Sequence, residues 1–289
     1  MTGRIISGLG IAIILAGWSW GMDMEAAKEL TEMGQQQTSG STSLAENEMA
    51  AAIELEGVAV PVPGELFAAI EKTGMPSWSA YFREPYSLAT TNRAQMALIL
   101  GGMIADGYVA TSARDRQQVK NMGKEILNLA RTLGVGQHIL SRGNSITAFA
   151  DLDVWEAIWE ELEAIENEIK MALGMQQDQD LVVLMSVGAW LRGLNVGSSL
   201  AAREYSPERA MILRQPLLIV FMRNQLEKLS SRTKADELVQ VVRSSLEELE
   251  PLVSFPPGQA PSREEVEVLE KMADNLVRRI LPGKSGGEQ

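Results

Sequence analysis

Apolar residues recur at three- and four-residue intervals over most of the chain between residues 44 and 281. One example is the series Val119, Met122, Ile126 and Leu129. This spacing places side chains on one face of an α-helix, whereas the alternation typical of strands is almost absent. The pattern therefore predicts an all-α fold. Because glycine and proline keep the helices short, we expect an irregular, mostly orthogonal bundle of about ten helices rather than a long coiled coil.

Two apolar segments, 97–111 and 183–197, share one pattern. A shift of 86 residues aligns them, which places Leu98 on Leu184, Gly102 on Gly188 and Gly107 on Gly193. This echo indicates a weak internal pseudo-repeat, and chance is the alternative explanation. Both segments are predicted to be central helices of the bundle.

The glycines inside these segments need a structural reason. A glycine within a helix costs about 0.5–1 kcal/mol relative to alanine, and close approach of a second helix is the usual compensation. We expect this role for Gly101, Gly102 and Gly188. Gly107 and Gly193 are expected to mark bends or ends, so the central helices should end near Val109 and Asn195.

Other boundaries follow from proline and from capping residues. Predicted caps are Ser112-x-x-Asp115, Asp153-x-x-Glu156, Ser206-Pro207, Thr233-x-x-Asp236 and Ser262-x-x-Glu265. Pro216 is expected to kink a helix that runs from Pro207 to about Leu229. The run 217–222, LLIVFM, is the most apolar after the N-terminus and is predicted to be the deepest element of the core.

A helix predicted after residue 153 is strongly amphipathic. Trp155 and Trp159 belong to its inward face, whereas Glu156 and Glu160 belong to a face that we expect to be solvated. A second aromatic group, Trp78, Tyr81 and Phe82, has two interpretations. It is either a plug of the core, which we favour, or the wall of a ligand pocket.

Charged residues inside apolar runs are the best candidates for a site. Asp106 and Arg192 occupy equivalent positions of the echo. Burying a charge is costly unless it is paired, so the two side chains could meet as a central salt bridge. They are then either a purely structural pair or part of a polar pocket. The candidate ligand-binding residues are Asp106, Tyr108, Trp190, Arg192 and Asn195.

Composition narrows the chemistry. The chain has no cysteine and one histidine, His138, which excludes disulfides, thiolate catalysis and sites with several histidines. No phosphate-binding loop, Ser/His/Asp arrangement or metal-ligand spacing is present. His138 is expected to be structural, and no cofactor or metal is predicted. An enzyme that uses carboxylates and arginine is the least favoured function.

The net charge is −12. A protein that binds nucleic acid without sequence preference needs a basic face, so nucleic-acid binding is not expected. The same charge argues against docking of the folded part on anionic lipid. Solubility is the simplest explanation of the acidic composition.

Residues 1–21 have the features of an export signal. Arg4 precedes the apolar stretch 5–17, and Ser19-Trp20-Gly21 supplies small residues for cleavage before Met22. The alternative is an uncleaved anchor over residues 5–22, which reach the minimum length for a membrane span. Either interpretation places the rest outside the cytoplasm. An exported chain without cysteine fits a bacterial periplasm best.

The predicted organisation after the signal is simple. A polar linker covers residues 22–43, a single helical domain covers 44–281, and residues 282–289 form a tail. We expect an exported, non-catalytic helical protein that acts through binding or through protein–protein interaction. The alternative is a periplasmic small-molecule carrier with its pocket between the two central helices. The identity of the protein partner or the small-molecule ligand is not predicted.

Overall fold

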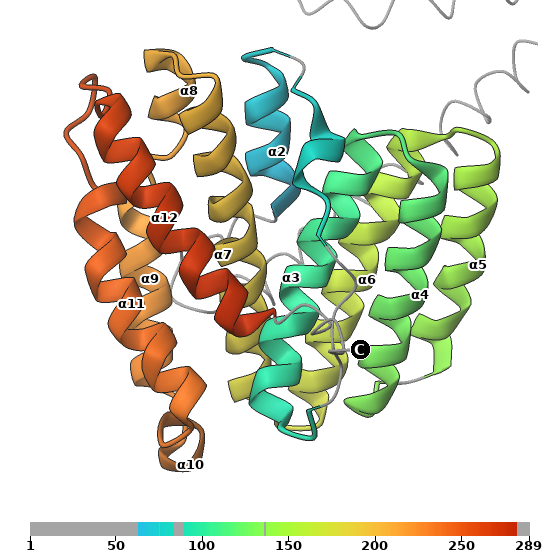
Figure 1. Cartoon of the computed structure of the whole chain (residues 1–289). Coiled ribbons are helices and arrows are strands. Elements are labelled where there is room, and N and C mark those ends of the chain that lie inside the picture. Colours follow the sequence, from blue (N-terminus) through green and yellow to red (C-terminus); the bar gives the residue numbers. More distant parts are fainter. Residues whose placement is uncertain (1–62, 75, 84–89, 136, 282–289) are drawn as a thin grey trace, which may run out of the picture. The chain divides into compact units, whose positions relative to one another are not determined.

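A computed structural model of the chain describes residues 63–74, 76–83, 90–135 and 137–281, with the side chains of 137–141 excepted. Within these residues all regular structure is helical and no strand occurs, so the all-α prediction is confirmed (Figure 1). All of them lie in one unit, 60–289. The elements are α2 (Pro63–Glu71), the 3₁₀ helix η2 (Trp78–Tyr81), α3 (Arg93–Ser112), α4 (Arg116–Thr132), α5 (Gln137–Asp151), α6 (Trp155–Met175), α7 (Gln179–Arg203), α8 (Pro207–Met211), α9 (Pro216–Glu227), α10 (Ser231–Lys234), α11 (Glu237–Val253) and α12 (Arg263–Ile280).

Three predictions about the chain ends lie outside the described residues. These are the export signal at 1–21, the linker at 22–43 and the tail at 282–289. The start of the helical domain at residue 44 lies outside them as well.

Helices α3 and α7 form the centre of the bundle. They pack against each other, α12 packs on α7, and α4 and α6 pack on α3 (Figure 1). Every residue of α3 from Met96 to Thr111 is buried. The apolar character of α3 on all sides is what a helix enclosed by neighbours requires.

The α3–α7 contact depends on two glycines. A Cβ atom added at Gly101 would lie 1.9 Å from the carbonyl oxygen of Met185, and one added at Gly188 would lie 2.1 Å from that of Leu98. The helices therefore touch backbone to backbone, and the predicted glycine-mediated packing is confirmed. Gly102, the residue aligned with Gly188 in the echo, faces the Leu281 side chain instead. The two halves of the echo thus make different contacts.

The predicted ends of the central helices are wrong. Gly107 and Gly193 lie inside α3 and α7, which continue to Ser112 and Arg203. The physical reason is that these glycines also make room for a neighbour. A Cβ at Gly107 would lie 3.0 Å from Leu162, and one at Gly193 would lie 3.2 Å from Leu66.

The prediction for residues 207–229 is also wrong. The segment forms two helices, α8 and α9, and Pro216 occupies the first turn of α9, where a missing N–H costs nothing. Leu217 and Val220 are 77% and 41% exposed, so the run 217–222 is not the deepest core. Helix α9 packs on α11 and α7 and leaves its other face to solvent.

Two predicted caps are confirmed. Ser206 Oγ accepts a hydrogen bond from the Arg209 N–H, and Ser262 forms a complete capping box with Glu265. The other three predictions place the cap too early. Ser112 and Thr233 still belong to the preceding helices, and Asp115 and Asp236 are the caps of α4 and α11. The residue before α6 is Val154 rather than Asp153, and it makes no side-chain cap.

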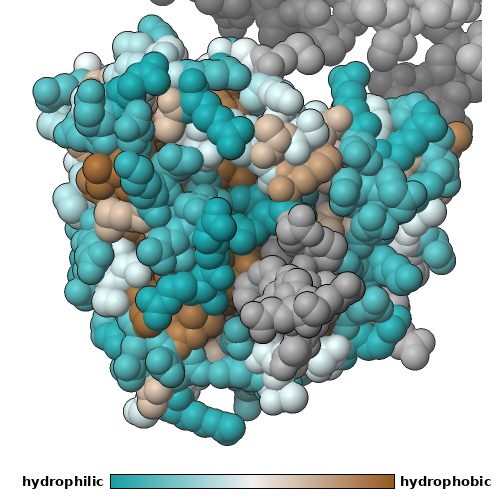
Figure 2. Space-filling view, viewed as in Figure 1, coloured by the Kyte–Doolittle hydropathy of each residue, from teal (hydrophilic) through white to brown (hydrophobic). Residues whose placement is uncertain are grey.

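Helices α3 and α7 are long and apolar enough to cross a membrane by length and composition alone. Their most apolar windows are 94% and 83% buried inside the bundle, and core helices pass the same test. The molecular face in Figure 2 is mostly hydrophilic, with scattered apolar patches. We attribute the hydropathy of both helices to their central position.

Candidate functional site

Asp106 and Arg192 meet in the core, so the central salt bridge predicted from the echo is confirmed. Arg192 Nε donates to Asp106 Oδ1 over 2.7 Å, and its Nη1 donates to Asn195 Oδ1 over 2.5 Å. The side chains of Asp106 and Arg192 are only 7% and 4% exposed. Both charges are therefore withdrawn from water, which the pairing must offset.

The same guanidinium holds a peripheral segment to the core. Arg192 Nη2 donates to the carbonyl oxygen of Tyr81 over 2.6 Å. Arg83, just after η2, donates from Nη2 to the carbonyl oxygen of Leu281 over 3.2 Å. The network thus ties η2 and the end of α12 to the central pair of helices, which is a structural role.

The electrostatics of this network reflect its burial. Burial raises the pKa of Asp106, and the positive charges of Arg192 and Arg83 oppose that rise. Burial also lowers the pKa of Arg83, and the charge of Arg192 lowers it further. Asp106 Oδ2 is buried and has no hydrogen-bond partner among the described residues, so the carboxylate is only partly compensated.

Tyr108 and Trp190 lie away from this network. A step of two residues along a helix turns the side chain by about 200°, to the opposite face. The Tyr108 ring packs on Trp159 with centroids 5.0 Å apart, and Trp190 Nε1 donates to Gln215 Oε1 over 2.6 Å. The structure therefore joins Asp106, Arg192 and Asn195 but not the other two candidates. Ligand binding by any of the five stays a prediction.

The aromatic residues of 76–83 also differ from one another in burial. Trp78 is buried and meets the Phe67 ring edge to face at 5.5 Å, as a core plug would. Tyr81 is half-buried, and the Arg203 guanidinium lies 5.2 Å from its ring centroid. We find the core-plug interpretation supported for Trp78.

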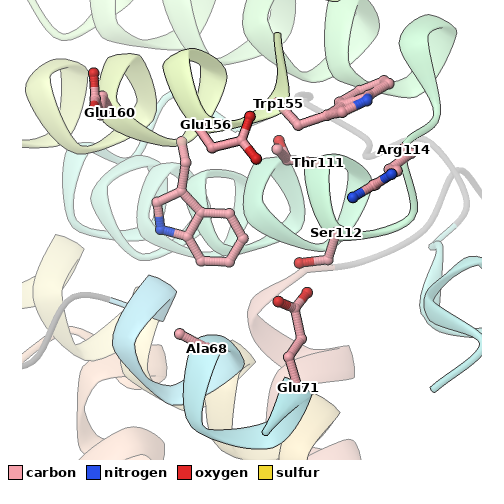
Figure 3. A pocket seen from close by; sticks show the side chains of 9 residues that line it. Ala68, Glu71, Thr111, Ser112, Arg114, Trp155, Glu156 and Glu160 are labelled. Carbon is pink, nitrogen blue, oxygen red and sulfur yellow. The ribbon is translucent and has the colours of Figure 1, made fainter. Parts of the chain in front are cut away.

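A pocket of about 390 Å³ lies between α2, the end of α3 and the start of α6. Figure 3 shows that Glu71 and Ser112 face each other across it, whereas Trp155 and Arg114 lie toward one end and Glu160 toward the other. Both indole side chains that line it are half-buried. The lining residues are Ala68, Glu71, Thr111, Ser112, Arg114, Trp155, Glu156, Trp159 and Glu160.

Two ion pairs join the chain segments beside this pocket. Arg116 at the start of α4 binds Asp153, with Nε donating to Oδ1 over 2.7 Å, and Lys120 binds Asp151. Arg114 and Asp153 both have positive φ angles, 53° and 58°. At both positions the backbone closes the end of the preceding helix, since the Asp115 N–H donates to the Ala110 carbonyl and the Val154 N–H donates to the Phe149 carbonyl.

Two hydroxyl groups, one lining the pocket and one in contact with the Trp159 side of it, have no hydrogen-bond partner among the described residues. Ser112 Oγ lines the pocket, exposes less than 1 Å² and has no hydrogen-bond partner within the described residues. The Tyr108 hydroxyl, behind Trp159, also lacks a partner there, and burial raises the pKa of Tyr108. A buried hydroxyl without a partner costs free energy unless a water or ligand satisfies it.

The sequence predicted these pocket residues only in part. Trp155 and Trp159 were expected to face the core and Glu156 and Glu160 to face solvent, yet all four line one pocket at the border between those faces. The signal was the Trp-Glu pair repeated after four residues in α6. What it could not indicate is that α2 packs opposite, because that contact is remote in sequence.

Among the side chains that the structure describes, no group of three His, Asp or Glu residues could hold a metal ion. The absence of a metal site stays a prediction. His138 belongs to the first turn of α5, and its side chain lies outside the described part. Comparisons with protein-family models, with curated proteins and with solved structures find no match to this chain.

Proposed function

We propose that this chain is an exported, non-catalytic protein that binds a small molecule in the pocket between α2, α3 and α6. The observation that carries the proposal is the pair of half-buried tryptophans, Trp155 and Trp159, on the wall of one pocket. Tryptophan offers a large apolar surface at low conformational cost, and such side chains dominate ligand pockets.

The dimensions fit this proposal. A volume of about 390 Å³ lies in the range of pockets for small molecules, roughly 300–1,000 Å³. Two solvent-exposed ion pairs, Arg116–Asp153 and Lys120–Asp151, also join the loops beside the pocket, although exposed pairs contribute only about 0–1 kcal/mol each. Of the two functions expected from the sequence, the pocket favours the small-molecule carrier, at a different place from the one predicted.

The network around Asp106 and Arg192 supports the same proposal indirectly. Arg192 is engaged by Asp106, by Asn195 and by the Tyr81 carbonyl oxygen, which joins three parts of the bundle. We assign the network to the stability of the bundle. The pocket is the site where we expect recognition to occur.

Binding can be tested with a variant that fills the pocket. Ala68 lines the pocket from α2, and Ala68→Phe adds a ring there without removing a polar contact. We expect at least one compound from a mixed set of cationic, neutral and anionic small molecules to raise the Tm of the full chain but not that of Ala68→Phe. Equal responses from both proteins, or none from either, would contradict the proposal.

The control for that experiment is Ala148→Phe, which adds the same ring on the exposed side of α5. It should respond like the unchanged protein. A loss of response in Ala148→Phe would show that an added phenyl ring acts nonspecifically.

Export is the second part of the proposal and has its own measurement. Arg4, the apolar stretch 5–17 and the small residues before Met22 support cleavage after Gly21. We expect the intact mass of the protein recovered from the periplasm to correspond to residues 22–289. Recovery of the full-length chain in the membrane fraction would instead favour the anchor.

A further inference from the structure

We infer that the ligand of this pocket is an organic cation, such as an alkylated ammonium ion. The inference rests on the proposed function, because it names the chemical class that the same pocket would take. Its basis is the combination of indole rings, an excess of carboxylates and a buried hydroxyl without a partner.

The pocket wall carries more negative than positive charge. Three carboxylates, from Glu71, Glu156 and Glu160, and one guanidinium, from Arg114, line it, which leaves two negative charges in excess. These four side chains belong to exposed residues, so solvent and salt screen each one. They therefore attract cations to the pocket and repel anions, without providing a tight ionic contact.

The two indoles supply the selective contact. Trp155 and Trp159 are four residues apart and line the same pocket from one face of α6. The face of an indole ring attracts a cation held within about 6 Å, more strongly than the rings of Tyr or Phe do. An indole alone would accept any apolar group, and carboxylates alone would accept any cation. Their combination favours a cation that is also apolar.

Ser112 provides an independent indication of a ligand. Its Oγ exposes less than 1 Å² on the pocket wall and has no hydrogen-bond partner in the described part of the chain. Figure 3 shows this hydroxyl opposite Glu71. A ligand N–H or hydroxyl that enters between the two groups, with a small shift of the atoms that cover Ser112 Oγ, would satisfy this hydroxyl and lie beside a carboxylate.

A metal ion suits the pocket less well. The described residues contain no group of three His, Asp or Glu side chains close enough to hold one. The three carboxylates are spread over α2 and α6, and indole rings do not ligate metals. An organic cation needs no such convergence, because its charge is spread over an apolar surface.

The test compares choline with 3,3-dimethylbutan-1-ol, which has the same shape without the charge. Isothermal titration of the full chain should give at least about tenfold tighter binding of choline. Equal affinities would overturn the inference of a cation while leaving the binding proposal intact. Binding of neither compound would also overturn it, and the mixed set with Ala68→Phe would then judge the binding proposal separately.

Single substitutions test which pocket residues bind choline. A cation–π contact of roughly 0.5–2 kcal/mol corresponds to about a twofold to thirtyfold change in affinity. We expect a loss in this range for Trp155→Ala, a smaller loss for Trp155→Phe, and a weaker choline affinity for Glu156→Gln. Glu248→Gln, at an exposed position on α11, should change nothing. Unchanged choline affinity in Trp155→Ala would contradict the assignment.

Discussion

At the scale of single residues, the Asp106–Arg192 pair couples the two most buried helices of the bundle. One oxygen of the carboxylate is bonded and the other has no partner among the described residues, so the pair is only partly satisfied. Replacing such a pair with apolar residues is often tolerated, whereas removing one partner leaves a buried charge uncompensated. Single and double substitutions of the pair should therefore differ in their effect on the free energy of unfolding.

The first prediction concerns the coupling between Asp106 and Arg192. Asp106→Ala and Arg192→Ala should each lower the free energy of unfolding by about 3–5 kcal/mol, and the double variant should cost less than the sum of both. Urea melts of the four proteins give the coupling. Strict additivity would show that the two side chains do not interact.

The second prediction concerns pH. Because burial raises the pKa of Asp106 in the folded protein above its value in the unfolded chain, the protonated form favours folding. Its contribution is complete below about pH 4 and is lost as the pH rises through the folded pKa. The stability of the unchanged protein should therefore fall relative to that of Asp106→Asn as the pH rises from about 4. An opposite slope would mean that Arg192 outweighs burial.

At the scale of elements, the contact of α3 with α7 sets the geometry of the bundle. The third prediction is that Gly101→Ala lowers the free energy of unfolding by about 3 kcal/mol or more, because the added Cβ would lie 1.9 Å from a backbone oxygen. The matched control is Gly174→Ala in α6, where the nearest atom lies 3.5 Å away. Thermal melts should show it unchanged or up to about 1 kcal/mol more stable. Similar losses in both would argue against the close crossing.

A fourth prediction concerns two helix caps that meet. Asn92 Oδ1 accepts from the first turn of α3, and its Nδ2 donates to Asp236 Oδ2 over 2.5 Å. Asp236 Oδ1 in turn accepts from the first turn of α11. Asp236→Ala should cost about 1–2 kcal/mol in a denaturant melt, near the upper end for a lost cap, because α11 loses its cap and Asn92 Nδ2 loses its acceptor. A change below about 0.5 kcal/mol would show that the shared contact is not formed.

Helix periodicity and the central glycines were readable from the sequence because both act locally. A spacing of three to four residues defines a face, and a glycine inside an apolar helix indicates close packing wherever the neighbour lies. The ends of the helices were harder to predict from the sequence. Pro216 can kink a helix or start one, and only the turn formed by residues 212–215 decides between these. Gly107 and Gly193 make room for a neighbouring side chain. In the sequence alone, such a glycine cannot be told from one that ends a helix.

At the scale of the whole molecule, the site could be predicted only where one contact dominated. Asp106 and Arg192 were identifiable because buried charges must pair. Tyr108 and Trp190 were grouped with them by proximity in sequence, although they lie on opposite helix faces. The pocket is formed by residues of three helices, from Ala68 to Glu160 along the chain, and no local pattern indicates how those helices pack.

The region that we assign to stability and the proposed binding pocket lie in different parts of the molecule. The central helices and their charge pair are assigned to stability, and the proposed recognition lies at one edge, in the pocket lined by α2, the end of α3 and the start of α6. We expect a ligand there to contact Trp155 and Trp159, whereas the other described tryptophans, Trp78 and Trp190, are buried in the core. The tryptophans of this chain are therefore natural reporters of where a ligand binds.

The most direct test follows the indole N–H signals of the ¹⁵N-labelled protein during a titration with the mixed set of small molecules, choline included. Single Trp→Phe variants assign the signals. The account predicts saturable shifts of the Trp155 and Trp159 signals by at least one compound, while the signals of Trp78 and of Trp190, whose N–H is bonded to Gln215, stay in place. Shifts confined to other tryptophans, or none with any compound, would contradict it.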